Sequence, residues 1–298
     1  TLTANGGSAI ADASAVSVGS GAVFNLGASE TVGSIAGAGN ISLGSFTLTA
    51  GGDNSSTTAS GVISGTGALT KTGTGALTLS GANTYNGTTT VSAGTLKAGS
   101  ITGFSSNSAL NVASGATLDL AGYNSTIFGL SSTTTNGTIT NSGSLAQLTI
   151  SKAFGQNSTA GTTAQLFTGN LSIQLFGGGT TDSILTNTAN TYSGGTTFGN
   201  GTTNTRLLVA NSIGAGSPGA VTSGIYGTGT ITLGAAVTDQ VQFYFNSGLT
   251  VNNAFVVNSA AGQGGSDTGA FRSESTGVVL AGSINANLAD AMFSAING

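Results

Sequence analysis

The feature that most restricts the fold of this chain is a short apolar alternation interrupted by glycine, clearest in Gly61–Ser100. Within it Leu77 alternates with Leu79, and Val91 and Leu96 follow in the next two short runs. Such alternation predicts strands with one buried face, and the glycines between the runs predict turns that need unusual backbone angles. Nothing in the stretch has the three-to-four spacing of a helix. The glycines that separate the runs are Gly65, Gly67, Gly73, Gly75, Gly81, Gly87 and Gly94.

Internal repetition extends this pattern over much of the chain. Residues Ser14–Ile35 align with Ser108–Leu130, and in both copies the next alternating pair begins eight residues after the last. This spacing fits a short strand followed by a tight turn. In the alignment Val16 and Val18 match Leu110 and Val112, Phe24 and Leu26 match Leu118 and Leu120, and Gly21 matches Gly115.

Two further motifs recur. The first, Ile-x-Gly-x-Gly-x-(Ile/Leu), begins at Ile35, Ile63 and Ile225. The second, Asn-Thr-Tyr-x-Gly followed by a Thr pair, occurs at Asn83–Thr90 and Asn190–Thr197. In the second copy the preceding strand carries Thr186 where the first copy has Leu79, which leaves its register open.

The Gly61–Ser100 stretch resembles the autotransporter-associated β-strand repeat, also called the passenger-associated transport repeat, of bacterial surface and secreted proteins. The matching residues are Gly65–Gly73, Leu77–Tyr85, Gly87, Thr89–Val91 and Ala93–Leu96. The resemblance implies secretion and display at the bacterial surface, and leaves any binding activity open. It also implies a signal peptide and an outer-membrane barrel, which we expect to lie outside this sequence.

The predicted fold is all-β: a right-handed parallel β-helix, or β-solenoid, forming a single elongated domain over residues 1–298. Three short strands would make one turn of the solenoid, here called a rung, in about 24 residues. The handedness follows from the family and from the general crossover preference. We expect 1–132 and 181–283 to be repeat-like and 133–180 to be less regular. Residues 284–298 would be a terminal cap or docking segment, with Asn285–Phe293 either a short helix or a last strand.

Charge is scarce, at 5% of residues with a net charge of −4. The basic residues are spread along the chain, which excludes an electrostatic footprint for nucleic acid or anionic lipid. No apolar run approaches the roughly 20 residues of a membrane helix, so we expect no membrane insertion by this chain. A chain with so few long charged side chains to protect strand edges should tend to self-associate. The five basic residues are Lys71, Lys97, Lys152, Arg206 and Arg272.

Catalytic chemistry has little support. The chain contains no His and no Cys, which excludes Ser-His-Asp and Cys-His nucleophilic sites and the common zinc sites. Paired carboxylates could still cleave a polysaccharide, but the acidic residues follow no recurring motif, and most are expected in or beside turns, where Asp accepts backbone hydrogen bonds. The densest group is Asp267, Arg272 and Glu274, which we interpret as an exposed ion pair. We therefore predict no catalytic, cofactor-binding or metal-binding residue and no cofactor. The acidic residues are Asp12, Glu30, Asp53, Asp119, Asp182, Asp239, Asp267, Glu274 and Asp290.

Three other patterns have a functional and a structural interpretation. Gly214–Gly219 matches a dinucleotide fingerprint, but more Gly-broken strand follows it instead of a helix, so a turn is favoured. The Thr-rich runs Thr88–Thr90 and Thr133–Thr135 could form an ice-binding ladder, although the Thr pairs do not recur at a constant spacing. Tyr85 and Tyr192 could be exposed sugar-stacking rings, but a repeated aromatic beside Gly more often fills a core.

The function that these patterns favour is a non-enzymatic, extracellular structural protein at the bacterial surface. It would be either an autotransporter passenger or a fibre subunit that associates end to end with its own copies. The alternatives are an adhesin or binding module for glycans or ice, and a polysaccharide-degrading β-helix enzyme. The residues that carry this function would be the inward-facing ones that stack between rungs, here called the inward ladder, together with the turn glycines. The ladder comprises Leu77, Leu79, Val91, Leu96 and their equivalents.

Overall fold

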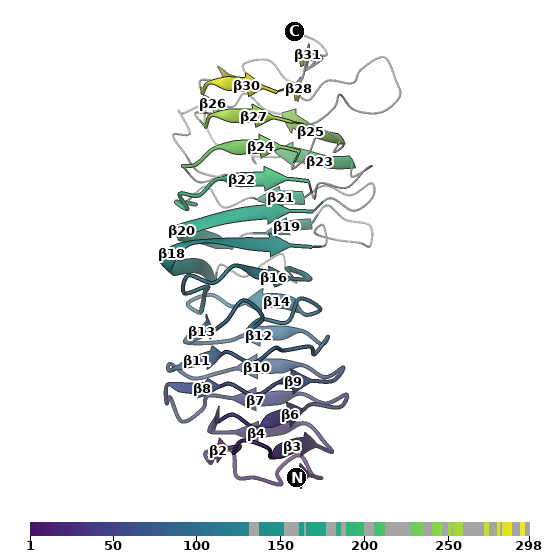
Figure 1. Cartoon of the computed structure of the whole chain (residues 1–298), viewed down its shortest axis with the longest axis vertical. Coiled ribbons are helices and arrows are strands. Elements are labelled where there is room, and N and C mark those ends of the chain that lie inside the picture. Colours follow the sequence, from purple (N-terminus) through teal and green to yellow (C-terminus); the bar gives the residue numbers. More distant parts are fainter. Residues whose placement is uncertain are drawn as a thin grey trace. The chain divides into compact units, whose positions relative to one another are not determined.

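The computed structural model divides the chain into two compact units, Thr1–Leu148 and Thr149–Gly298. All described residues with regular structure are in strands, without a helix. The all-β parallel solenoid predicted from the alternating pattern is confirmed in both units (Figure 1). The structure describes residues 1–130, 137–151, 161–163, 165–176, 183–185, 189–199, 206–211, 228–234, 240–245, 250–251, 253–258, 271–273, 279–280, 282–287 and 293–295.

The strands of the first unit are mostly three or four residues long, as the alternating runs predict. They are β1 (Leu2–Ala4), β2 (Ala15–Ser17), β3 (Val23–Leu26), β4 (Glu30–Val32), β5 (Ser34–Ala36), β6 (Asn40–Ser42), β7 (Leu48–Ala50), β8 (Thr57–Ala59), β9 (Ile63–Ser64), β10 (Leu69–Lys71), β11 (Ala76–Leu79), β12 (Thr89–Val91), β13 (Thr95–Ala98), β14 (Ala109–Val112), β15 (Thr117–Asp119), β16 (Ser125–Ile127), β17 (Gly129–Leu130) and β18 (Thr138–Ile150), which ends in the second unit.

The second unit has more varied strands. They are β19 (Gly161–Thr163), β20 (Leu166–Leu175), β21 (Ser183–Leu185), β22 (Thr196–Phe198), β23 (Arg206–Asn211), β24 (Ile231–Leu233), β25 (Gln240–Phe245), β26 (Thr250–Val251), β27 (Phe255–Val257), β28 (Phe271–Ser273), β29 (Val279–Leu280), β30 (Ile284–Ala286) and β31 (Phe293–Ala295).

In the first unit each strand pairs in parallel with its counterpart one rung further along the chain. Sheet A contains β1, β3, β6 and β9; sheet B contains β2 and β5. Sheet C has the order β4-β7-β10-β12-β14-β17, and sheet D includes β8, β11, β13, β15 and β18. One strand per sheet in each rung lets an inner strand hydrogen-bond to the rungs on both sides of it, and an outermost strand to one rung only.

The rungs of the first unit are shorter than the predicted length. Registered partners lie 17 residues apart at Phe24 and Ile41, and 22 apart at Leu2 and Phe24. The prediction of about 24 residues per rung is therefore wrong for this unit. Several of its corners contain only a few residues, which shortens the path around each rung.

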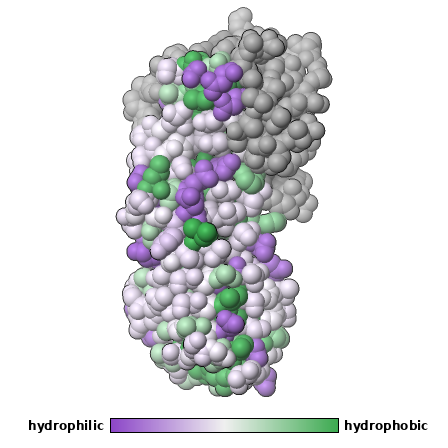
Figure 2. Space-filling model, viewed as in Figure 1, coloured by the Kyte–Doolittle hydropathy of each residue, from purple (hydrophilic) through white to green (hydrophobic). Residues whose placement is uncertain are grey.

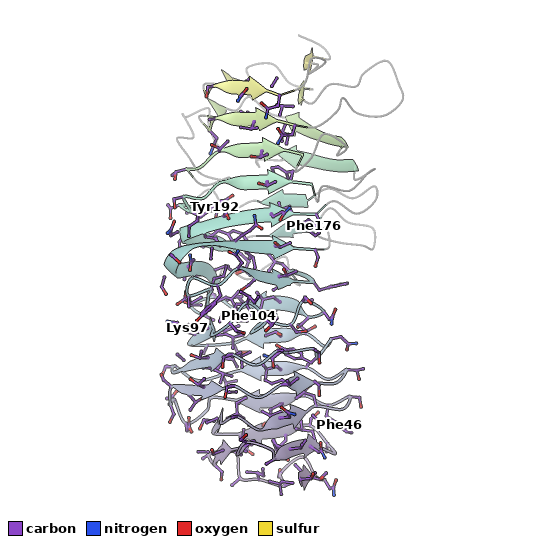
Figure 3. All side chains as sticks on the ribbon, in the orientation of Figure 1. Phe46, Lys97, Phe104, Phe176 and Tyr192 are labelled. Atoms are coloured by element: carbon purple, nitrogen blue, oxygen red, sulfur yellow. The ribbon has the colours of Figure 1, made fainter. Side chains whose placement is uncertain are left out.

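Inward side chains form continuous ladders across the rungs. In sheet D, Leu77 stacks on Leu96 and Leu96 on Leu118, and all three are buried. Val91 of sheet C stacks on Val112, and Leu79 lies between Ala59 and Ala98. The predicted ladder residues Leu77, Leu79, Val91 and Leu96 are thus confirmed as core, with outward side chains on the other face of each sheet (Figure 3).

Glycine is required at two kinds of corner. Gly21 and Gly115, which the internal repeat aligns, have φ angles of 77° and 80°, a conformation that side chains disfavour. At Gly61 and Gly81 the reason is space, since an added Cβ of either would collide with the backbone of the rung below. The predicted role of the glycines as corner residues is confirmed at these positions.

In the second unit the β20-β22-β24-β27-β30 series and the β23-β25-β28-β31 sheet follow the same parallel scheme. Ile173 pairs with Thr196, 23 residues on, but Thr196 pairs with Ile231, 35 residues on. Residues 284–286 and 293–295 are strands, so the described ends of Asn285–Phe293 follow the strand interpretation of the tail. Residues 288–292 lie outside the described part.

The stretch 133–180 contains two long strands, β18 and β20, of 13 and 10 residues. This differs from the short strands on either side, although residues 133–136, 152–160, 164 and 177–180 lie outside the described part. In the third Ile-x-Gly-x-Gly motif, Ile231 is buried in β24, while Ile225 and Gly227 are not among the described residues.

Candidate functional site

The Asn-Thr-Tyr motif forms the same buried arrangement in both units, in which the Tyr hydroxyl hydrogen-bonds to a Thr four residues later; we call it the clasp. Tyr85 and Tyr192 are completely buried, so the alternative of exposed sugar-stacking rings is wrong. The Tyr85 hydroxyl lies 2.6 Å from Oγ1 of Thr89, and the Tyr192 hydroxyl hydrogen-bonds to Thr196 in the same way. Burial raises the pKa of Tyr85 to about 12 and raises that of Tyr192 well above its ordinary value.

This clasp explains why a threonine is tolerated in each apolar ladder. Thr89 occupies an inward position between Leu69 and Leu110, and a buried hydroxyl there needs a hydrogen-bond partner. The tyrosine four residues earlier supplies it, and Ser108 of the next rung lies 2.8 Å from the Thr89 hydroxyl. The motif is therefore structural, as the core interpretation of the tyrosines predicts.

The asparagine of the motif joins neighbouring rungs. Oδ1 of Asn83 accepts a 2.7 Å hydrogen bond from the backbone N–H of Ile63, and Nδ2 donates to the carbonyl of Gly103 at 2.6 Å. In the second unit Oδ1 of Asn190 accepts a 2.8 Å bond from the N–H of Phe167. Each amide oxygen thus accepts a hydrogen bond from a strand residue about one rung earlier in the chain, in β9 or in β20.

Lys71 is the most unusual inward residue, with 1% of its surface exposed. Its Nζ donates to the carbonyl of Gly73 at 2.9 Å, to that of Ala93 at 3.4 Å, and to that of Thr72. Burial lowers the pKa of Lys71, and the negative charge of Asp53 opposes that shift. The ammonium group thus holds two successive corners together.

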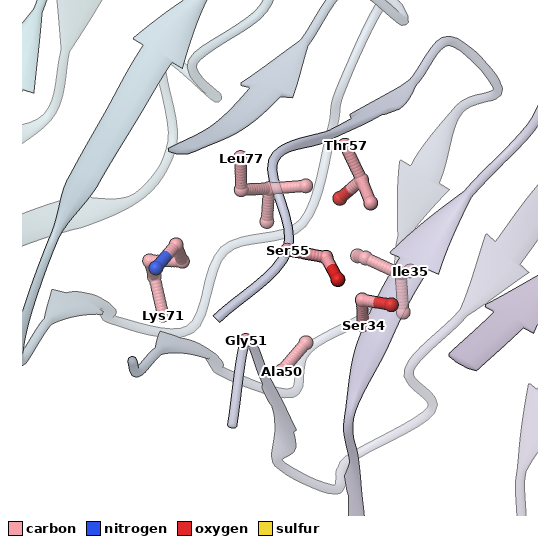
Figure 4. Close-up of a pocket in the computed structure, with 8 residues that line it drawn as sticks. All are labelled: Ser34, Ile35, Ala50, Gly51, Ser55, Thr57, Lys71 and Leu77. Carbon is pink, nitrogen blue, oxygen red and sulfur yellow. The ribbon is translucent and has the colours of Figure 1, made fainter. Parts of the chain in front are cut away.

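A small hollow lies beside Lys71 (Figure 4). Its empty space of about 160 Å³ is partly open to solvent, and it is lined by Ser34, Ile35, Ala50, Gly51, Ser55, Thr57, Lys71 and Leu77. Ligand pockets usually measure 300–1,000 Å³. The hollow is too small for an organic ligand of ordinary size, so it is not a candidate binding site.

The carboxylates of the described residues are dispersed and serve the backbone. Asp12 and Asp53 lie in turns as predicted, but Glu30 is buried in β4, where it accepts 3.1 Å hydrogen bonds from the N–H groups of Ala9 and Ile10. Among the described residues no three acidic, His or Cys residues gather as metal ligands. The predicted group of Asp267, Arg272 and Glu274 lies outside the described side chains, as do Asp182, Asp239 and Asp290.

Asp119 is buried at the end of β15, beside the turn at Ala121, whose N–H donates a 2.9 Å hydrogen bond to its Oδ1, as predicted for acidic residues in or beside turns. Burial opposes its ionisation, but hydrogen bonds from Ser142 and Ala121 outweigh it, so the pKa of Asp119 is lowered. Oδ2 lies 2.7 Å from the Ser142 hydroxyl and 3.6 Å from Nζ of Lys97, which reaches the outer surface (Figure 3). This arrangement supports a corner and offers no reactive pair.

The outward side of sheet C carries an ordered array of hydroxyl groups. Thr31, Thr49, Thr70 and Thr90 occupy one registered column through β4, β7, β10 and β12. The observation that Thr pairs lack a constant spacing in the sequence misses this column, because rungs of unequal length bring the residues into register. The registered positions two residues before this column are Ser29, Thr47, Ala68 and Thr88, and those two residues after it are Gly33, Gly51, Thr72 and Ser92. We call the nine Ser and Thr residues of the three columns the hydroxyl face.

Three large apolar side chains are exposed at one corner of successive rungs. Ile101, Tyr123 and Leu145 are 66%, 39% and 56% exposed, and they follow β13 and β15 and lie within β18, three strands paired in that order. The backbone of Gln147 donates to Asn124 at 2.8 Å, which holds the last two corners together. We call these three residues the apolar corner. The rest of the visible surface is mostly of intermediate hydropathy (Figure 2).

Three remaining predictions concern other segments. Gly214–Gly219 and Thr133–Thr135 lie outside the described residues. In Thr88–Thr90 the outer threonines face outward and Thr89 faces the core. Within the described part of the chain, no helix is long and apolar enough to span a bilayer.

Comparison with known proteins agrees with the resemblance found in the sequence. The model of the passenger-associated transport repeat matches residues 69–98, which include β10 to β13 and the first Asn-Thr-Tyr clasp. The chain is 34% identical over 224 residues to the protein named Adhesin BmaC autotransporter of Brucella suis biovar 1 (strain 1330). The alignment covers 75% of this chain and 6% of the length of that relative. No solved structure matches the chain significantly.

Proposed function

Because this chain is a β-solenoid of the autotransporter passenger-repeat family, we propose that it is a non-enzymatic, cell-surface segment that holds an adhesive contact surface outward. Its stacked ladders provide a rigid body, and rigid elements hold a contact surface with less loss of entropy on binding. The similarity to a protein named as an adhesin supports contact with another surface as the role. Secretion and display at the cell surface are part of the proposal.

The observation that carries the proposal is the apolar corner. Large apolar side chains stacked at the surface mark interaction sites more often than isolated ones do. Ile101 and Tyr123 lie just after β13 and β15, and Leu145 lies within β18, so the paired strands set their positions before contact. The neighbouring ion pair of Lys97 and Asp119 is internally balanced and leaves the corner without net charge.

The test measures adhesion of beads coated with the 298-residue chain to cultured cells and to glycan-coated surfaces. We expect the triple change of Ile101, Tyr123 and Leu145 to Ser to remove most of the adhesion, because these residues supply the apolar contact. The matched control is Phe128→Ser, which alters an exposed apolar residue elsewhere. Equal adhesion of the triple variant and the unaltered chain would contradict the proposal.

We propose end-to-end self-association as a second function. It rests on the parallel stacking of the strands, a scheme that a strand from a second copy can continue. The scarcity of charge supports it. Negative-stain microscopy over a range of protein concentrations tests it: filaments that lengthen with concentration are expected, and discrete particles at all concentrations would count against it.

A further inference from the structure

We propose that the hydroxyl face of sheet C binds the surface of ice. The residues involved are separate from the apolar corner, so the proposal is independent of adhesion. It begins from register: Thr31 pairs with Thr49, Thr49 with Thr70, and Thr70 with Thr90. The four side chains therefore form one straight column with a repeat of about 4.8 Å, the spacing of paired strands.

Further hydroxyl groups flank this line on both sides. The N–H of Glu30 bonds to the carbonyl of Thr47 at 3.0 Å, and that of Leu69 bonds to the carbonyl of Thr88 at 3.1 Å, so the register continues one residue before the strands. The preceding column reads Ser29, Thr47, Ala68 and Thr88, and the following column reads Gly33, Gly51, Thr72 and Ser92. Alternate residues in a parallel strand lie about 6.6 Å apart, so three hydroxyls flank the central column on one side and two on the other.

The chemistry of the face suits ordered water. A hydroxyl both donates and accepts hydrogen bonds, as water does, so either orientation of a lattice water is matched. The branched Thr side chain is restricted at χ1, which reduces the entropy lost when the array binds a rigid lattice.

The charge distribution separates this face from its neighbour. Glu30 and Lys71 of sheet C both point inward, which leaves only uncharged side chains on the outward side of β4, β7, β10 and β12. The outward side of sheet D instead carries the Lys97–Asp119 ion pair between its threonines. The three columns, Ala68, Gly33 and Gly51 included, also contain no aromatic ring on which a sugar stacks. These features favour ice over a glycan.

The test follows the labelled 298-residue chain during slow growth of ice from solution. We expect the unaltered chain to enter the ice and to change the shape of single ice crystals. Thr70→Lys places a long charged chain at the centre of the array and should exclude the protein from ice. The matched control is Thr95→Lys on the outward side of sheet D, which should enter ice as the unaltered chain does.

A second variant separates loss of fold from loss of the site. The double change Thr49→Val and Thr70→Val keeps the branched shape and removes two hydroxyls, and circular dichroism should show an unchanged fold with reduced entry into ice. The proposal is overturned if the unaltered chain is excluded from ice like a reference protein such as albumin. It is also overturned if Thr95→Lys reduces entry into ice as much as Thr70→Lys does, or if the Val variant enters ice as fully as the unaltered chain. A third contradictory result is that Thr70→Lys abolishes binding to a polysaccharide but not to ice.

Discussion

The two units share the parallel stacking of strands, but the sequence spacing between paired residues is more regular in the first unit than in the second. In the first, registered partners lie 17 to 22 residues apart, as from Leu48 to Leu69. In the second, the described partners lie 22 to 35 apart, as from Thr196 to Ile231. Despite this difference the inward ladders persist, with Ile173, Thr196, Ile231 and Phe255 stacked in register. The requirement of the fold is thus the stacking of inward residues, and the length of chain between them is free to vary.

The clasp provides the clearest common element. Tyr85 with Thr89 and Tyr192 with Thr196 occur at the same four-residue separation, in rungs of different length. Their surroundings differ, because Thr89 also lies near Ser108, whereas in the described residues the Thr196 hydroxyl bonds to Tyr192 alone. The same motif should therefore contribute differently to the stability of each unit.

The largest expected effect comes from a charge placed in a ladder. Leu79→Asp, between Ala59 and Ala98, should lower the free energy of unfolding by roughly 4 kcal/mol, because a buried carboxylate there has no partner. Leu233→Asp, between Phe198 and Val257, is the counterpart in the second unit. Hydrogen exchange should show loss of protection across neighbouring rungs for Leu79→Asp and a more local loss for Leu233→Asp. An unchanged urea transition for Leu79→Asp would mean that this ladder position is exposed.

The next effect is alkaline destabilisation through the buried tyrosines. The pKa of Tyr85 is raised from its ordinary 10.0 to about 12, so the stabilising contribution is complete below pH 10 and is lost as the pH rises towards 12. At about 1.4 kcal/mol per pKa unit, the loss from Tyr85 approaches roughly 3 kcal/mol. Tyr192 acts in the same direction. Urea unfolding at increasing pH measures the slope, and Tyr85→Phe should make it shallower; an equal slope in the variant would refute this assignment.

A smaller effect distinguishes the two clasps at neutral pH. Tyr85→Phe should cost about 1 kcal/mol, because Ser108 still satisfies Thr89, whereas Tyr192→Phe should cost about 2 kcal/mol by leaving the Thr196 hydroxyl unsatisfied. Thermal unfolding of the two variants provides the comparison. A larger loss of stability for Tyr85→Phe than for Tyr192→Phe would contradict this prediction.

The smallest effect is expected at the surface of the first unit. Lys97→Ala removes a half-exposed partner of Asp119 and should cost at most about 0.5 kcal/mol. Asp119→Ala is the matched variant and should cost about 1–2 kcal/mol, because the N–H groups of Ala121 and Ser142 lose their acceptor. Urea unfolding of both variants tests whether backbone support or the ion pair matters more.

Sequence reasoning identified the strands, the inward ladder and the glycine corners because each depends on local pattern. Leu77, Leu79 and Leu96 alternate with polar residues, and this alternation alone predicts their burial. The hydroxyl face depends instead on register between rungs of unequal length, which one sequence does not specify. The burial of Glu30 and Lys71 could not be predicted from local pattern either, since it depends on hydrogen bonds to backbone groups that the fold brings to them. For the apolar corner, the sequence offers one local signal: the turns around Ile101 and Tyr123 imply that these residues are exposed.

The asparagine clasp has a consequence for how such a chain can change in length. Asn83 bonds one way to Ile63 and the other way to Gly103, positions 20 residues before and 20 after it. Duplicating or deleting a stretch of that size restores an equivalent neighbour on each side, whereas an arbitrary insertion within the strands does not. Genes for such chains can therefore lengthen or shorten by recombination in whole rungs, and the protein remains able to fold after each change.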